Sequence, residues 1–206
     1  MSLSVDELRT RLIAALQALP ASAEELRELD AALGDGDLGL TVKAGSLAAA
    51  EAIGKLPAEA VLSDVLLATG KAFSTANPST FGALVGGGLL AGAKAVMGRR
   101  EAGRDEALAV GRAVAARIAE RGKSQLGDKT VLDALVPSLD TLEAQDAGSG
   151  ERALVDAMIV TASQQVSATA ALQSKKGRAA WVQERSIGHP DPGATAWLRF
   201  LEAWRG

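Results

Sequence analysis

The chain has 206 residues, a formal net charge of −3, 48% hydrophobic residues and no cysteine. This length suits one domain with a sizeable core, so we expect residues 1–206 to form a single domain. The lack of cysteine excludes disulfides and thiol chemistry and suits a cytoplasmic protein. The negative charge argues against a general nucleic-acid binder. The longest apolar stretch, residues 81–96, is broken by glycines and too short to span a membrane, and we expect no secretory signal.

Apolar residues recur at three- and four-residue steps along most of the chain, which is the period of an amphipathic helix. Ser4 with Glu7, and Ser22 with Glu25, have the spacing of a capping box and mark the first two helix starts. Further helices are expected over residues 38–53, 62–76, 81–97, 104–121, 129–144, 152–172 and 192–204. Alanine and leucine outnumber the β-branched residues, which favours helix over strand. About eight helices with short loops predict an all-α fold, an antiparallel bundle or barrel.

Three aspartates, Asp30, Asp35 and Asp37, fall within eight residues, and no apolar pattern accounts for them. Glycines at Gly34 and Gly36 let the backbone bend sharply, so the three carboxylates can converge. Converging anions repel one another unless a hard cation lies among them, and magnesium or calcium prefers carboxylate oxygens. The later ligand positions of an EF-hand loop are missing, so calcium of that kind fits poorly. The alternative interpretation is a polar turn whose aspartates cap helices.

Two more polar segments lie between expected helices. In residues 121–130, Asp128 is well placed as the N-cap of the next helix, and the residue order of a Walker A loop is absent. An ordinary capped turn is the alternative there. In residues 174–191, Arg178 offers a guanidinium suited to phosphate, and Asp191 can cap a helix that begins at Pro192. A long, charged loop in a small helical bundle is more often functional than not.

Together, these segments resemble the L subunit of bacterial dihydroxyacetone kinase, which is equivalent to the nucleotide-binding C-terminal domain of the single-chain, ATP-dependent kinases. The resemblance runs over nearly the whole chain. It is carried by Leu29-Asp30 with Gly34-Asp-Gly-Asp37, by Gly127-Asp-Lys-Thr130, and by Glu184-Arg-Ser-Ile-Gly-His189 before Asp191-Pro-Gly-Ala194. It implies a barrel of eight antiparallel helices with a nucleotide bound in the loops at one end.

The resemblance also implies roles for single residues. It implies two Mg2+ ions held by Asp30, Asp35 and Asp37, in agreement with the unaided interpretation of these carboxylates. It implies contacts to ADP or ATP from residues near the ends of the expected helices: Gly39, Leu40, Thr41, Ser79, Thr80, Gly122, Val131, Arg178, Asp191, Pro192 and Gly193. No residue is expected to be a covalent catalyst, and for His189 a loop-ordering role is favoured over a phosphohistidine.

The partners follow from the same resemblance. A separate K-type subunit would hold the ketose, and the present chain would supply the phosphoryl group. A phosphoenolpyruvate-dependent phosphocarrier protein would recharge a retained ADP in some relatives, whereas others exchange ATP, and the sequence leaves this choice open. It also leaves open whether the chain forms a homodimer.

The chain departs from the family pattern at two places. Leu38 and Thr41 stand where the family usually has histidine and asparagine, and Pro78 removes a backbone donor from the segment that corresponds to the phosphate loop. These changes motivate a second hypothesis, a nucleotide-binding regulatory paralogue that transfers nothing. A structural bundle with relic loops is a third. We expect an active kinase subunit.

Overall fold

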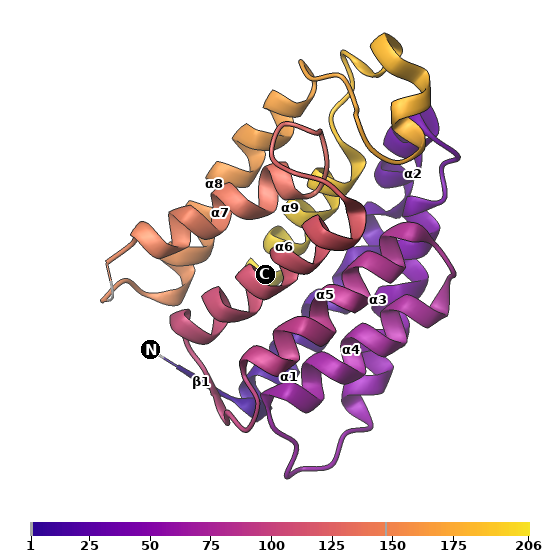
Figure 1. Cartoon of the computed structure of the whole chain (residues 1–206). Coiled ribbons are helices and arrows are strands. Elements are labelled where there is room, and N and C mark those ends of the chain that lie inside the picture. Colours follow the sequence, from indigo (N-terminus) through magenta and orange to yellow (C-terminus); the bar gives the residue numbers. More distant parts are fainter. Residues whose placement is uncertain (1, 147) are drawn as a thin grey trace.

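The structure, a computed structural model, describes residues 2–146 and 148–206. Within these residues the chain forms nine α-helices, two 3-10 helices and one two-stranded ladder (Figure 1), which confirms the predicted all-α class. The elements are β1 (Leu3–Ser4), α1 (Val5–Ala18), η1 (Leu19–Ser22), α2 (Ala23–Leu33), α3 (Leu38–Gly54), α4 (Leu62–Ala76), α5 (Thr80–Ala95), β2 (Glu101–Ala102), α6 (Arg104–Gly122), α7 (Leu132–Ala144), α8 (Glu151–Thr169), η2 (Arg178–Ser186) and α9 (Pro192–Arg205).

Eight of the helices close into a ring. Each helix from α3 to α8 packs against the next one in the chain, and α1 contacts both α3 and α9. Neighbouring helices run antiparallel, and the short helix α2 adds to one end of the ring beside α3 (Figure 1). As a result, α3, α5, α7 and α9 all begin at the end where α2, α4, α6 and α8 finish. The residues that follow or precede these helix ends are thereby gathered in one place.

Two apolar clusters fill the ring. One gathers side chains of α1, α3 and α4, among them the fully buried Ile53 and Val65, and the other gathers side chains of α6, α7 and α8. The glycines of α5 serve close packing: a Cβ on Gly86 would lie 2.6 Å from the Cβ of Ser74 on α4. Among the described residues, no helix combines the length and the apolar composition needed to span a membrane.

Of the two expected capping boxes, the first is confirmed and the second does not form, although α2 does begin next to Ser22, at Ala23. The main-chain N–H of Ser4 donates to Glu7 Oε2 at 2.8 Å, and the N–H of Glu7 donates to Ser4 Oγ at 3.3 Å, which completes the capping box. Ser22 ends η1 instead, has helical backbone angles and makes no capping hydrogen bond. Because η1 runs directly into α2, no free helix start exists there for Ser22 to cap. The ladder that pairs Leu3 with Ala102 was not predicted, since two-residue strands show no alternation.

The expected role of Asp128 is also wrong. The helix begins at Leu132 rather than at Lys129, whose backbone is left-handed with φ 60°. Asp133 acts at this helix start instead: its carboxylate accepts from the N–H groups of Gly127, at 2.6 Å, and Thr130, at 2.7 Å. Asp128 accepts from the N–H of Gln125 at 3.1 Å. Asp133, in the first turn of α7, was not expected to have this role, because the helix was predicted to begin before it.

Candidate functional site

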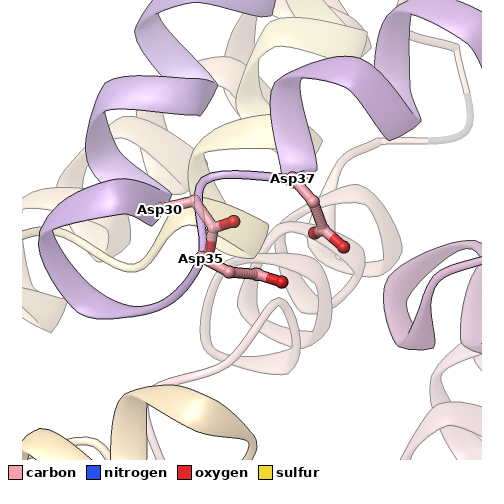
Figure 2. Close-up of side chains that lie close together, drawn as sticks. All are labelled: Asp30, Asp35 and Asp37. Atoms are coloured by element: carbon pink, nitrogen blue, oxygen red, sulfur yellow. The ribbon is translucent and has the colours of Figure 1, made fainter.

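The three aspartates of the first motif converge at one turn (Figure 2). Asp30 lies in the last turn of α2, and Asp35 and Asp37 lie in the connection to α3. One oxygen from each carboxylate lies within 4.8 Å of the others. Gly36 makes the turn with φ +73°, a conformation that costs glycine little. The main-chain N–H of Leu38 donates to Asp30 Oδ2 at 3.1 Å and fixes this carboxylate toward the turn.

The charges of this cluster are only partly balanced. Burial, and then the neighbouring Asp35 and Asp30, raise the pKa of Asp37 above its ordinary value, and Arg178 opposes the shift. Arg178 Nη1 bonds to Asp35 Oδ2 and lies 3.8 Å from Asp37 Oδ2. One guanidinium thus contacts two of three carboxylates that lie together. Because all the donors are carboxylate oxygens and their mutual repulsion is incompletely relieved, the cluster fits a hard divalent cation such as magnesium.

The turn depends on a very close approach between α2 and α3. A Cβ on Gly39 would lie 2.0 Å from the carbonyl oxygen of Ala23 and 2.9 Å from the N of Arg27, both backbone atoms that have little room to move. Gly39 therefore fixes the start of α3, and with it Asp37, against α2. Gly39, which was expected to contact the nucleotide, thus has a packing role.

We expect Gly39→Ala to lower the free energy of unfolding by about 1–3 kcal/mol, because the added methyl group pushes the backbones of α2 and α3 apart. Chemical denaturation measures the change. The matched control is Gly54→Ala at the other end of α3, where nothing lies within 4 Å of the added Cβ, and where we expect a change below about 0.5 kcal/mol. Equal stability of the two variants would contradict the close approach.

A second group of expected residues lies where α5 begins beside α3. Asn77 Nδ2 donates to Thr41 Oγ1 at 2.8 Å, and Ser79 caps α5 by accepting from the N–H of Gly82 at 3.0 Å. Thr80 is the first residue of α5. Leu40, on the same turn of α3, is 59% exposed. Of the three expected hydroxyls, those of Thr41 and Ser79 thus already have partners within the protein.

A third group lies where α7 and α9 begin. A Cβ on Gly193 would lie 3.4 Å from the Cβ of Val131, so these two helix starts are adjacent. The predicted cap of α9 is confirmed: Asp191 Oδ2 accepts from the N–H of Ala194 at 2.7 Å, and Pro192 occupies the first turn. Gly122 ends α6, where a Cβ would lie 3.1 Å from Ser124 Oγ.

All three groups lie at the same end of the ring, because α3, α5, α7 and α9 begin there. The free N–H groups and the macrodipole of each helix give a helix start partial positive charge, which favours anions. Arg178 adds a full positive charge at the aspartate turn. A phosphate chain with a bound cation suits this combination of helix starts, arginine and carboxylates. No hydrogen bond or ion pair among the described residues joins the starts of α7 and α9 directly to the three aspartates.

Sequence reasoning missed two residues of this end. Nothing in the sequence around Asn77, which precedes Pro78, indicated that this residue contacts Thr41. Lys129 was also missed, because a lysine between an aspartate and a threonine is expected to be a solvated loop residue. In the structure only 2% of its surface is exposed. The position of Lys129 in a motif shared with the resembled family was the one available signal.

Comparison with known proteins places these motifs in a family. The sequence profile of the DAK2 domain matches residues 32–206. The ADP-binding subunit DhaL of the PEP-dependent dihydroxyacetone kinase of Escherichia coli (strain K12) is 31% identical over 205 residues, which cover 98% of this chain and 96% of that protein. The D-erythrulose kinase of Mycolicibacterium smegmatis is 39% identical over 189 residues, which cover 87% of this chain and 31% of that kinase.

A solved structure shows the same fold. The crystal structure of the dihydroxyacetone kinase from C. freundii, in complex with AMP-PNP and Mg2+, matches 98% of this chain with a TM-score of 0.76 and 22% sequence identity. The match covers 34% of that chain. The present chain therefore spans about a third of the larger kinases and nearly the whole length of the E. coli subunit.

Proposed function

The chain belongs to the DAK2 domain family, and from this premise we propose that it is the nucleotide- and magnesium-binding subunit of a ketose kinase. In this proposal it supplies the phosphoryl group to dihydroxyacetone or a related ketose such as erythrulose, held on a separate K-type subunit. The observation that carries the proposal is the convergence of Asp30, Asp35 and Asp37 at the end of the ring where four helices begin. The name of the E. coli relative, an ADP-binding subunit of matching length, supports it.

Each group of the site has a part in this function. Asp30, Asp35 and Asp37 would hold two magnesium ions, which neutralise phosphate oxygens when bound. The N–H groups at the start of α3 and α5, with Ser79 and Thr80, would hold the phosphates, and Val131 would pack against the base. Arg178 contributes positive charge beside the carboxylates. Such chemistry depends on positioning and charge neutralisation rather than on a protein nucleophile.

The phosphoryl group can come either from ATP or from a retained ADP that is rephosphorylated on the subunit. The relatives from Escherichia coli and Lactococcus lactis are named as subunits of PEP-dependent and PTS-dependent kinases. By analogy, we propose that this chain retains ADP, which a phosphocarrier protein rephosphorylates. Direct use of ATP is the alternative, because the C. freundii kinase, of which the match covers 34%, was solved with the ATP analogue AMP-PNP and Mg2+.

A regulatory subunit is the second candidate, and one observation favours it. The side chain of Leu38, which replaces the family histidine, is 5% exposed and belongs to the apolar core, so it offers no polar group to a nucleotide. A protein with this change could bind nucleotide and transfer nothing.

Reconstitution separates the two candidates. The purified chain is mixed with a K-type subunit and dihydroxyacetone, and with either ATP or phosphoenolpyruvate and its phosphocarrier proteins. The kinase proposal predicts dihydroxyacetone phosphate with one of the two donors, and none when the chain is omitted. Magnesium-dependent nucleotide binding without product in either mixture would overturn the kinase proposal in favour of the regulator.

A further inference from the structure

Lys129 is a buried lysine whose ammonium group binds two distant segments of the same loop. Its side chain is enclosed, with 2% of the residue exposed. Lys129 Nζ donates to the carbonyl oxygen of Leu172 at 3.0 Å and to that of Ser186 at 2.6 Å. Burial lowers the pKa of Lys129, and the nearby Asp191 opposes this shift. Burying an ammonium group is costly unless hydrogen bonds compensate, so a residue that only filled space here would be apolar.

The two carbonyl groups lie at the two ends of residues 172–186, the loop that contains η2. Further hydrogen bonds close the loop at the same level. The N–H of Ser174 donates to Ser186 Oγ at 2.9 Å, and the N–H of Gly188 donates to the carbonyl oxygen of Ala170 at 2.8 Å. Hydrogen bonds therefore join the two ends of the loop at its base, and Lys129 bonds to both ends.

The start of the loop is also tied to Asp128: the N–H of Lys175 donates to the carbonyl oxygen of Asp128 at 3.1 Å, and the ammonium groups of Lys175 and Lys176 lie 3.7 Å and 3.6 Å from its carboxylate. The outer part of the loop, beyond Lys176, has fewer contacts. It lies over the end of α2 (Figure 1), and Arg178 reaches from it to Asp35 and Asp37. Trp181, its largest side chain, is 80% exposed. Since little apolar surface is buried here, the position of Arg178 depends mainly on the polar contacts at the loop base, those of Lys129 and those of Asp128.

We propose that Lys129 is a positioning residue, which holds residues 172–186 closed so that Arg178 stands over the aspartate turn. The closure itself is independent of any ligand. Its consequence for nucleotide binding rests on the proposed function.

Limited proteolysis with trypsin tests the closure on the full chain without ligand, because the loop contains Lys175, Lys176, Arg178 and Arg185. We expect Lys129→Met to be cut within residues 175–185 about tenfold faster than the parent, since two buried carbonyl groups lose their donor and the loop opens more often. The matched control is Lys94→Met, an exposed lysine near the end of α5, which should be cut at the parental rate.

A second variant keeps the test decisive if Lys129→Met folds poorly. Ser186→Ala leaves the carbonyl group that Lys129 binds but removes the hydroxyl that accepts from Ser174, so we expect a smaller acceleration at the same sites. An unchanged loop in the two variants, or faster cutting spread evenly over the chain, would overturn the proposal.

Binding provides the readout that a purely structural lysine would not change. With magnesium and ADP as probes, the Lys129→Met variant should bind at least about tenfold more weakly than Lys94→Met, while its thermal unfolding without ligand remains cooperative. Loop opening with unchanged ADP affinity would overturn the positioning role. If the parent itself does not bind ADP, the proposed function fails, and the proteolysis still decides whether Lys129 closes the loop.

Discussion

Replacing Asp37 with asparagine is expected to abolish magnesium-dependent nucleotide binding while the fold remains intact. The substitution keeps the size of the side chain but removes one anionic ligand from a site made only of carboxylates, so we expect at least about a 100-fold loss of ADP affinity in the presence of magnesium. Isothermal titration of ADP at fixed magnesium measures it. The matched control is Asp105→Asn, an exposed aspartate in the first turn of α6, which should bind like the parent.

The same variant should be slightly more stable than the parent when metal is absent. Burial and the neighbouring aspartates raise the pKa of Asp37, so the ionised carboxylate lowers stability above that pKa. Because Asp37 is partly exposed, we expect a gain below about 1 kcal/mol. Parental affinity for magnesium and ADP in Asp37→Asn would show that the proposed metal site is wrong.

The second large effect is a dependence of stability on pH through Asp191. Burial, as the leading cause, raises the pKa of this N-cap carboxyl from 3.8 to about 7. Between these values the folded chain retains a proton that the unfolded chain has lost, so stability falls as pH rises toward 7 and levels off above it. The slope approaches about 1.4 kcal/mol per pH unit, for a total of a few kcal/mol.

Asp191→Asn isolates this effect, because asparagine is also a good N-cap. Chemical denaturation of both proteins between pH 4.5 and pH 8 gives the difference in free energy of unfolding. We expect the free energy of unfolding of Asp191→Asn, relative to that of the parent, to increase with pH up to about pH 7. Parallel curves for the two proteins would mean that Asp191 ionises in the folded chain as readily as in water.

The fold was largely predictable because helical periodicity and glycine punctuation act locally. The start of α6 at Arg104 and the start of α9 at Pro192 were predicted to the residue. The errors at Ser22 and Asp128 have a common cause. Each residue type is a good N-cap, but the backbone beside it does not allow the contact: η1 gives Ser22 helical angles, and the left-handed Lys129 moves the start of α7 from Lys129 to Leu132.

The candidate site was predictable only where chemistry alone marked it. Carboxylates close together in the sequence, without an apolar pattern around them, predict a cation site. The structure brings Asp30, Asp35 and Asp37 together as expected. The contacts of Asn77 with Thr41, and of Lys129 with the loop base, join segments far apart in the chain. Such contacts depend on how the ring closes, and no local pattern in the sequence encodes that.

Thermal unfolding of the purified chain, with and without magnesium and in the presence of ADP or ATP, tests the central claim most directly. A nucleotide at 100 times its dissociation constant adds about 2.7 kcal/mol, so we expect Tm to rise by about 5–10 °C when magnesium and nucleotide are both present. Each alone should cause a much smaller shift. If no combination changes Tm, and mass analysis finds no nucleotide released from the denatured protein, the chain is not the nucleotide-binding subunit that we propose.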